Sequence, residues 1–216
     1  MRFVEEFVEQ RSPEWLTLHI GVITASNAIG LSTPARRKTM GLTLAYESLS
    51  HHMPERGITD AMADGIESEA AMKARYRFDH DGDFRDIGFA WHPEFVGMAG
   101  CSPDLIWEDG NMVVEFKRRA GIQAMRDIVE GPKAEDLWQL QFQLWVMDAE
   151  YAHFVVSSPV LRSPFEFCVT RVDRDPKIFD KIPEYVKEVI GLKKENMQAA
   201  EEKYGHGEIY NWSAKQ

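Results

Sequence analysis

The chain has 216 residues, a mass of 24.8 kDa, 44% hydrophobic and 28% charged residues, and a mean hydropathy of −0.37. These values exclude disordered and fibrous proteins, and the length predicts a single domain over residues 1–216. No stretch approaches the roughly 20 apolar residues of a membrane span, and the start MRFVEEFVEQR lacks the basic-then-apolar pattern of a secretion signal. We therefore expect a cytoplasmic protein that does not associate with membranes.

Charge and cysteine content narrow the function classes further. The 25 Lys and Arg residues against 35 Asp and Glu residues give a formal net charge of −10, which argues against a protein that coats nucleic acid by overall positive charge. A local basic channel stays compatible with this balance. Cys101 and Cys168 are too few for a disulfide scaffold or a four-cysteine zinc or iron–sulfur site, so we expect both to be reduced and structural.

The first part of the chain has the pattern of helices. Apolar residues recur at helical spacing near the N-terminus and predict a helix there: Phe3, Val4, Phe7 and Val8. A loop at residues 12–13 precedes a second short helix around 15–20, and Ser26 is a candidate cap for a further one. Longer helical patterns include Ala45 and Leu49 and then cover 59–78.

The pattern changes after a turn at residues 79–83. From 84 to 117 the apolar runs are short or alternating, which predicts consecutive strands joined by tight turns. The turn residues that separate these runs are Pro93, Gly97, Gly100, Pro103 and Asp109-Gly110. This region is expected to form the sheet.

The last part of the chain combines both patterns. The segment 133–147 is ambiguous because glutamines alternate with apolar residues as in a strand, yet its length favours a helix. The alternating glutamines are Gln139, Gln141 and Gln143. Strands are predicted at 151–157 and 165–172, and a long helical pattern covers 175–204. The order of elements predicts an α/β fold.

A cluster of charged residues lies in the predicted strands. Asp104 begins one strand, and Glu115, Phe116 and Lys117 lie in the next. Since residues two apart share a face of a strand, Glu115 and Lys117 project together and Phe116 points into the opposite, apolar layer. A twisted hairpin can bring Asp104 beside Glu115. Two such carboxylates suit Mg²⁺, and a nearby lysine can orient or deprotonate a water or stabilise charge on phosphate.

A Pro-Asp followed by Glu-x-Lys is the signature of restriction-endonuclease-like nucleases, but so short a pattern also arises by chance on a solvated hairpin. Further motifs in order along the chain favour the nuclease interpretation. They are WLTLHIGVITAS (15–26), GIESEA (65–70), GCSPDLI (100–106), VEFK (114–117) and QLQFQLWV (139–146). Together they resemble the lambda-type phage exonucleases, also called viral recombinases, over roughly residues 15–146.

This resemblance implies a restriction-endonuclease-like core, with a central mixed β-sheet flanked by helices, and a metal site within it. By similarity, Asp104 and Glu115 are metal carboxylates, with the Phe116 carbonyl as a backbone ligand. Glu69 is the third acidic residue of a site for two Mg²⁺ ions, with Mn²⁺ as an alternative. Lys117 is the catalytic lysine.

The resemblance also implies residues that contact phosphate. Gln141 matches a glutamine beside the reacting phosphate, and Ser26 and Ser102 match positions that help to hold a terminal 5′-phosphate. His19 stands where the family has a phosphate-binding arginine. Because histidine is only partly charged near neutral pH and lacks a bidentate fork, the 5′-phosphate preference is open, with Arg11 as a candidate substitute.

The activity implied by the resemblance is degradation of one strand of linear double-stranded DNA from its 5′ end. The products are mononucleotides and a 3′ overhang for recombination by strand annealing. The family forms a homotrimeric ring around DNA, which explains how an acidic chain retains it, and a single-strand annealing protein from the same phage or prophage in a bacterial host is an expected partner. The alternatives are a restriction-type endonuclease with the same residues and a non-catalytic protein that binds DNA ends.

Overall fold

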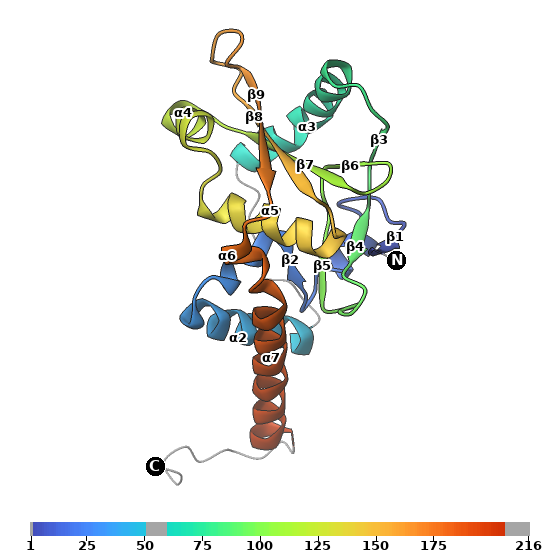
Figure 1. The fold of residues 1–216 in the computed structure, drawn as a ribbon. Coiled ribbons are helices and arrows are strands. Elements are labelled where there is room, and N and C mark those ends of the chain that lie inside the picture. Colours follow the sequence, from blue (N-terminus) through green and yellow to red (C-terminus); the bar gives the residue numbers. More distant parts are fainter. Residues whose placement is uncertain (1, 51–59, 206–216) are drawn as a thin grey trace.

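Two mixed β-sheets form the centre of the molecule, and helices pack around them (Figure 1). The computed structural model describes residues 2–50 and 60–205, with the side chains of its third α-helix described from Ser68 onward. The predicted α/β class is confirmed. However, the strands expected in one central sheet are divided between two.

The larger sheet has five strands in the order β3-β6-β7-β8-β9. Their bounds are β3 (Phe84–Arg85), β6 (Leu105–Trp107), β7 (Met112–Arg118), β8 (Tyr151–Ser157) and β9 (Phe167–Asp173). The central strand β7 is antiparallel to β6 and parallel to β8. Because parallel neighbours need a crossover, the chain forms α4 (Gly121–Glu130) and α5 (Ala134–Met147) between β7 and β8.

The smaller sheet has four strands in the order β1-β4-β5-β2. Their bounds are β1 (Val4–Glu6), β4 (Phe89–Trp91), β5 (Ala99–Cys101) and β2 (Ile23–Thr24). Gly100 lies where the sheet leaves no space for a side chain, since a Cβ atom there would lie 2.2 Å from Cε1 of Phe89. This close packing fixes the strand that leads into Ser102 and Asp104.

The predicted N-terminal helix is wrong, because residues 4–6 form strand β1 instead. Val4 pairs with Trp91 in the antiparallel β1–β4 ladder. Side chains add to this pairing: Glu5 accepts two hydrogen bonds from Arg85, at 2.7 and 2.9 Å, and Glu6 accepts one from the Trp91 indole at 3.0 Å. These partners are remote in sequence, and their contacts outweigh the local helical spacing.

The remaining helices of the first part agree with the sequence. They are α1 (Pro13–Thr17), the 3₁₀ helix η1 (Ala25–Leu31), α2 (Pro34–Ser50) and α3 (Asp60–Asp79). Ser12 caps α1 by accepting a hydrogen bond from the Trp15 amide at 3.1 Å. Ser26 lies inside η1 rather than at its cap, which is Thr24.

The predicted C-terminal helix is broken in two. It divides into α6 (Pro176–Phe179) and α7 (Ile182–Tyr204), because Pro183 suits a first helical turn and cannot continue a preceding one. In Figure 1, α7 runs beside α2 below the sheets. No helix within the described ranges is both long and apolar enough to span a bilayer.

The two faces of β7 pack against different helices. Val114 and Phe116 belong to an apolar cluster with Met72 and Tyr76 of α3. Val113 belongs to the main core, to which α5 contributes much of its buried surface. Because side chains alternate along a strand, this packing directs the side chains of residues 115 and 117 toward α5, as the sequence predicts.

Candidate active site

Glu115 is the most firmly held carboxylate of the predicted site. It is buried at 5% exposure near the end of β7. Its Oε1 accepts hydrogen bonds from Lys117 Nζ and Gln139 Nε2, both at 2.7 Å, and its Oε2 accepts one from Gln143 Nε2 at 2.7 Å. Gln139 and Gln143 are four residues apart on α5 and therefore share a helix face. The carboxylate orientation is fixed from both oxygens.

Asp104 approaches the same region from the neighbouring strand. It directly precedes β6, which pairs with β7 so that Leu105 lies opposite Val114. Asp104 Oδ2 accepts a hydrogen bond from the Phe116 amide at 2.7 Å. Burial raises the pKa of Asp104 well above its usual range, and the negative charges of Glu115 and then Glu69 raise it further. The three carboxylates thus form one electrostatic unit.

Lys117 lies between the carboxylates and α5. Its Nζ donates to Glu115 Oε1 at 2.7 Å and to Gln139 Oε1 at 3.0 Å. Burial alone would lower its pKa, but the charge and hydrogen bond of Glu115 outweigh this, and the pKa of Lys117 is raised. The ammonium therefore remains protonated at neutral pH and acts as a hydrogen-bond donor.

Glu69 faces the site from α3 and is held by cations. Lys73, one helical turn later, lies 2.9 Å from its Oε1, and Arg11 pairs with its Oε2. Burial opposes ionisation, yet the hydrogen bonds from Lys73 and Arg11 lower the pKa of Glu69. Glu69 is therefore ionised at neutral pH. The predicted motif partners Gly65, Ile66 and Glu67 lie in α3, outside the residues whose side chains are described.

The donor set fits a hard divalent cation. Oxygen ligands of carboxylates and backbone carbonyls are what Mg²⁺ prefers. Burial first, and then the charges of Glu115 and Glu69, raise the pKa of Asp104, and a bound cation would favour its ionised form. Among the side chains that the structure describes, those of residues 2–50 and 68–205, no three Asp, Glu, His or Cys residues stand close enough to enclose an ion. Glu69, paired with Arg11 and Lys73, is available only once those partners shift.

Gln139 and Gln143, rather than Gln141, contact Glu115. Gln141 is fully buried elsewhere: its amide nitrogen donates to the Asp173 carbonyl at 2.9 Å, and its oxygen accepts from the Asp175 amide at 2.8 Å. The reason is helical phase, because residues two apart on a helix lie about 200° apart around its axis. The (i, i+4) spacing of Gln139 and Gln143 was the available signal in the sequence.

Comparison with known proteins identifies the family of the chain. The sequence matches the YqaJ-like viral recombinase domain over residues 14–150. The chain belongs to this family. The match includes every motif that suggested the lambda-type resemblance, which is thereby confirmed. No curated protein matches the sequence significantly.

Solved structures share the fold of this chain. An alkaline exonuclease from Laribacter hongkongensis, LHK-Exo, superposes with a TM-score of 0.81 at 24% identity, covering 90% of this chain and 99% of that one. Its complex with dAMP gives 0.82 with the same identity and coverage. A phage related exonuclease from Haemophilus somnus 129PT gives 0.62 at 13% identity, covering 84% and 96%. The nuclease fold predicted from the motifs is confirmed.

Ser102 and His19, two of the predicted phosphate contacts, both form hydrogen bonds with Trp15. Its indole nitrogen donates to Ser102 Oγ at 2.9 Å, and Ser102 Oγ donates to the Gly88 carbonyl at 2.7 Å. His19 Nδ1 donates to the Trp15 carbonyl at 2.7 Å, with the two ring centroids 3.9 Å apart. Burial lowers the pKa of His19, so its ring is neutral at pH 7 and carries no charge for an anion.

Ser26 is exposed at the start of η1, which follows the strand that pairs with β5. It contacts Thr24, with 3.1 Å between the hydroxyl oxygens, and lines a cavity of about 510 Å³ between η1 and α2. Arg36 and Glu47 contribute charged side chains to the same cavity. Cys101 and Cys168 are both free, as predicted.

Proposed function

We propose that this protein is a Mg²⁺-dependent exonuclease that degrades one strand of linear double-stranded DNA from its 5′ end. The observation that carries the proposal is the buried Glu115 carboxylate, held by Lys117, Gln139 and Gln143 beside Asp104. Burying a carboxylate costs free energy unless it is hydrogen-bonded, so a hairpin with only a structural role is expected to leave this side chain in solvent. The family and the fold support the same activity.

Asp104, Glu115, Glu69 and the Phe116 carbonyl would hold two Mg²⁺ ions, or Mn²⁺ in their place. When bound, such ions supply Lewis-acid stabilisation of a phosphate and a source of hydroxide. The fold contributes rigidity, because Glu115 is oriented before any ligand arrives. Preorganised charge of this kind is the main source of electrostatic catalysis.

Lys117 and Gln139 would act on the reacting groups directly. Because the raised pKa keeps Lys117 protonated, it would donate a hydrogen bond to the attacking water or to the phosphate rather than remove a proton. Gln139, which already contacts both Lys117 and Glu115, would position that water in place of Gln141. Ser26 and Ser102 would contact the terminal 5′-phosphate, with neutral His19 adding no charge.

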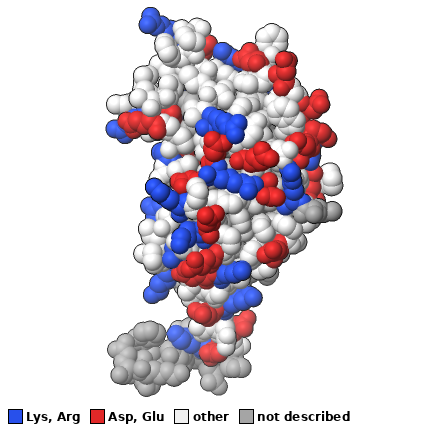
Figure 2. Space-filling view, in the orientation of Figure 1, with Lys and Arg blue, Asp and Glu red and all other residues white. Residues whose placement is uncertain are grey.

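The expected assembly and setting follow from the same proposal. Lys and Arg side chains alternate with Asp and Glu across the middle of the face in Figure 2, and that face carries no extended basic surface. A homotrimeric ring would retain DNA by enclosure and need only a basic lining. We propose that the ring works in the cytoplasm of a bacterial host, leaving a 3′ overhang for a single-strand annealing protein of the same phage or prophage.

The test compares closed circular DNA with the same DNA linearised and labelled at one end of each strand. Release of mononucleotides from the 5′ ends of the linear form alone, dependent on Mg²⁺, is the expected result. Cutting of the circle would instead identify a restriction-type endonuclease. Binding of ends without cutting, insensitive to Mg²⁺, would identify a non-catalytic end-binding protein. Sedimentation of a stable monomer in the presence of DNA would contradict the ring.

A further inference from the structure

A chain of ion pairs runs from the N-terminal loop to the end of α3. Its contacts are Arg11 with Glu69, Glu69 with Lys73 at 2.9 Å, Lys73 with Asp86 at 2.9 Å, and Asp86 with Arg77 at 2.6 Å. These residues line a cavity of about 340 Å³ together with Ala70. Three cations thus surround two carboxylates, and one of those carboxylates is Glu69 of the candidate site.

Arg11 and Arg77, the arginines at the two ends of this row of ion pairs, have N–H donors that make no hydrogen bond to the described residues. Arg11 contacts Glu69 through Nη2, and Arg77 contacts Asp86 through Nη2; neither makes another hydrogen bond to the part of the chain that the structure describes. Their side chains are 47% and 38% exposed. A guanidinium has five N–H donors in a planar fork that matches phosphate oxygens. The cavity therefore presents open donors suited to an anion.

The backbone at Arg11 is held in an unfavourable conformation. Its φ is +71°, in the left-handed region that is unfavourable for a residue with a side chain. The loop is fixed on both sides: Gln10 Nε2 donates to the carbonyls of Ile87 and Pro103 at 2.8 and 3.2 Å, and Ser12 caps α1. Glycine would fit here without strain, so placing arginine at this point suggests a use for its side chain.

We propose that Arg11, together with Lys73 and Arg77, binds a phosphate group of the DNA substrate, and that Arg11 becomes available when a divalent cation takes over Glu69. This inference rests on the proposed nuclease function. Without a cation, Arg11 and Lys73 neutralise Glu69. Once a cation binds that carboxylate, the cavity holds three positive side chains against Asp86 alone. Cation binding and phosphate binding are therefore coupled through Glu69.

The test measures binding of a short duplex by fluorescence anisotropy over a range of salt concentrations. Ca²⁺ replaces Mg²⁺ because it takes the same oxygen ligands in a looser geometry. The main variant is Arg11→Gly, which removes the guanidinium and relieves the left-handed backbone, and a thermal unfolding curve of the variant checks that it remains folded. We expect roughly tenfold weaker binding and a slope of log K against log salt smaller by about 0.9.

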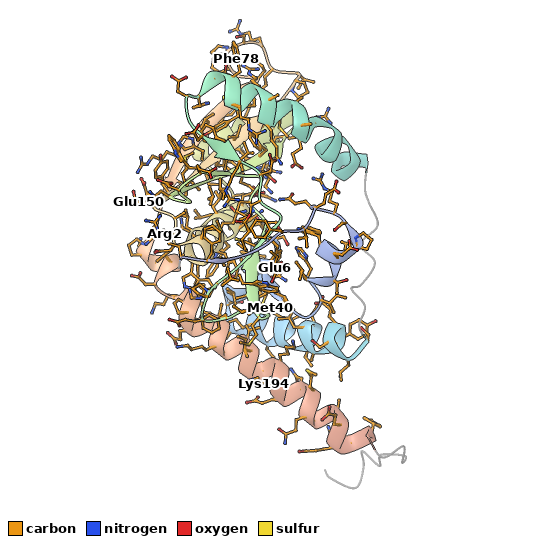
Figure 3. The ribbon with its side chains drawn as sticks, turned by 90° about the vertical axis from the view of Figure 1, so that its right-hand side faces the viewer. Arg2, Glu6, Met40, Phe78, Glu150 and Lys194 are labelled. Atoms are coloured by element: carbon orange, nitrogen blue, oxygen red, sulfur yellow. The ribbon has the colours of Figure 1, made fainter. Side chains whose placement is uncertain are left out.

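A remote charge provides the matched control. Lys194 is exposed on α7, on the opposite side of α2 from the sheets (Figure 3). Lys194→Ala removes the same unit of charge and is expected to leave both affinity and slope unchanged. In EDTA, Glu69→Gln is expected to strengthen binding by releasing Arg11, and this gain is expected to disappear in the Arg11→Gly background.

Duplexes that differ at their 5′ ends distinguish a terminal phosphate from a phosphate of the internal backbone. A loss on Arg11→Gly that is confined to 5′-phosphorylated duplexes assigns a terminal phosphate, whereas an equal loss with 5′-hydroxyl duplexes assigns the internal backbone. An unchanged salt slope in Ca²⁺ for Arg11→Gly would overturn the inference. Degradation of linear DNA by the unaltered protein is measured in parallel. If the unaltered protein degrades the DNA but Arg11→Gly leaves the salt slope unchanged, the Arg11 phosphate site is ruled out and the proposed nuclease function stands.

Discussion

The two carboxylates on either side of Asp104 are held in different ways. Glu115, on the α5 side of β7, is buried and receives two neutral amide donors in addition to Lys117. Glu69, on α3, is held by two cations, and the Arg11 side chain is about half exposed. Amide donors fix an orientation without neutralising charge, whereas cations compete directly with any metal ion for the same oxygens.

This difference divides the site into a fixed half and an exchangeable half. In the fixed half, one ion pair with Lys117 and two neutral amide donors hold Glu115 in the folded chain. The exchangeable half must give up an ion pair before Glu69 can contribute. The charge of Glu69 nevertheless reaches Asp104 and helps to raise the pKa of that carboxyl group. The predictions below test whether stability and activity separate along this division.

The largest expected effect comes from Asp104→Asn, which changes activity and stability in opposite directions. Loss of this proposed metal ligand is expected to lower kcat on the order of a thousandfold. In EDTA the variant is expected to be more stable by about 1–3 kcal/mol at pH 7, because asparagine avoids the repulsion from Glu115 and Glu69 yet still accepts the Phe116 amide hydrogen bond. Urea unfolding with and without Mg²⁺ measures this.

The pH dependence of this effect has a defined sign. Because the folded protein holds the proton of Asp104 more tightly than the unfolded chain, its stability in EDTA falls as pH rises through the raised pKa. Asp104→Asn removes that slope, and Mg²⁺ is expected to stabilise the unaltered protein but not the variant. Glu195→Gln, an exposed substitution on α7, is the control. If Asp104→Asn and the unaltered protein were equally stable at pH 7 in EDTA, the proposed repulsion of Asp104 by Glu115 and Glu69 would be contradicted.

The second prediction separates two glutamines of α5. Gln139→Ala is expected to lower kcat about 10- to 100-fold with little change in stability, because its amide contacts Lys117 and Glu115 from a half-buried position. Gln141→Ala is expected to reduce stability by about 2–3 kcal/mol and leave kcat of the folded protein nearly unchanged, since it removes two buried hydrogen bonds.

Steady-state kinetics and urea unfolding of both variants provide the measurement. Each variant serves as the control for the other, because both delete the same side chain from the same helix. The reverse result, with kcat lost in Gln141→Ala and stability lost in Gln139→Ala, would restore the assignment made from the sequence motif.

Part of this site follows from the sequence because it depends on local geometry. The period of a strand places Glu115 and Lys117 on one face and Phe116 on the other, and the structure confirms this. The glutamines were predictable in principle, since the helical phase of α5 brings Gln139 and Gln143 together. The motif alone did not settle this phase, because Gln139 and Gln141 both lie within it.

Other features depend on contacts between remote residues and could not be read from the pattern. Apolar spacing near Val4 is compatible with a helix until the β4 strand pairs with it. The contact of Arg11 with Glu69 joins residues 58 positions apart, and neither residue's neighbourhood indicates the other. The neutral state of His19 likewise depends on its burial against Trp15 and Phe89, which only the folded structure supplies.

The smallest expected effect concerns His19, which belongs to neither half of the site. Because its lowered pKa lies further below neutrality than usual, the ratio of KM values for 5′-hydroxyl and 5′-phosphorylated ends is expected to vary little between about pH 7 and pH 9. His19→Arg adds a permanent charge beside Trp15 and is expected to raise that ratio about three- to tenfold while leaving kcat unchanged. Lys194→Ala, away from the site, is expected to leave the ratio unchanged. If His19→Arg alters kcat but not the ratio, the terminal phosphate lies elsewhere, and the Arg11 cavity and the cavity of Ser26 and Arg36 become the candidate sites for it.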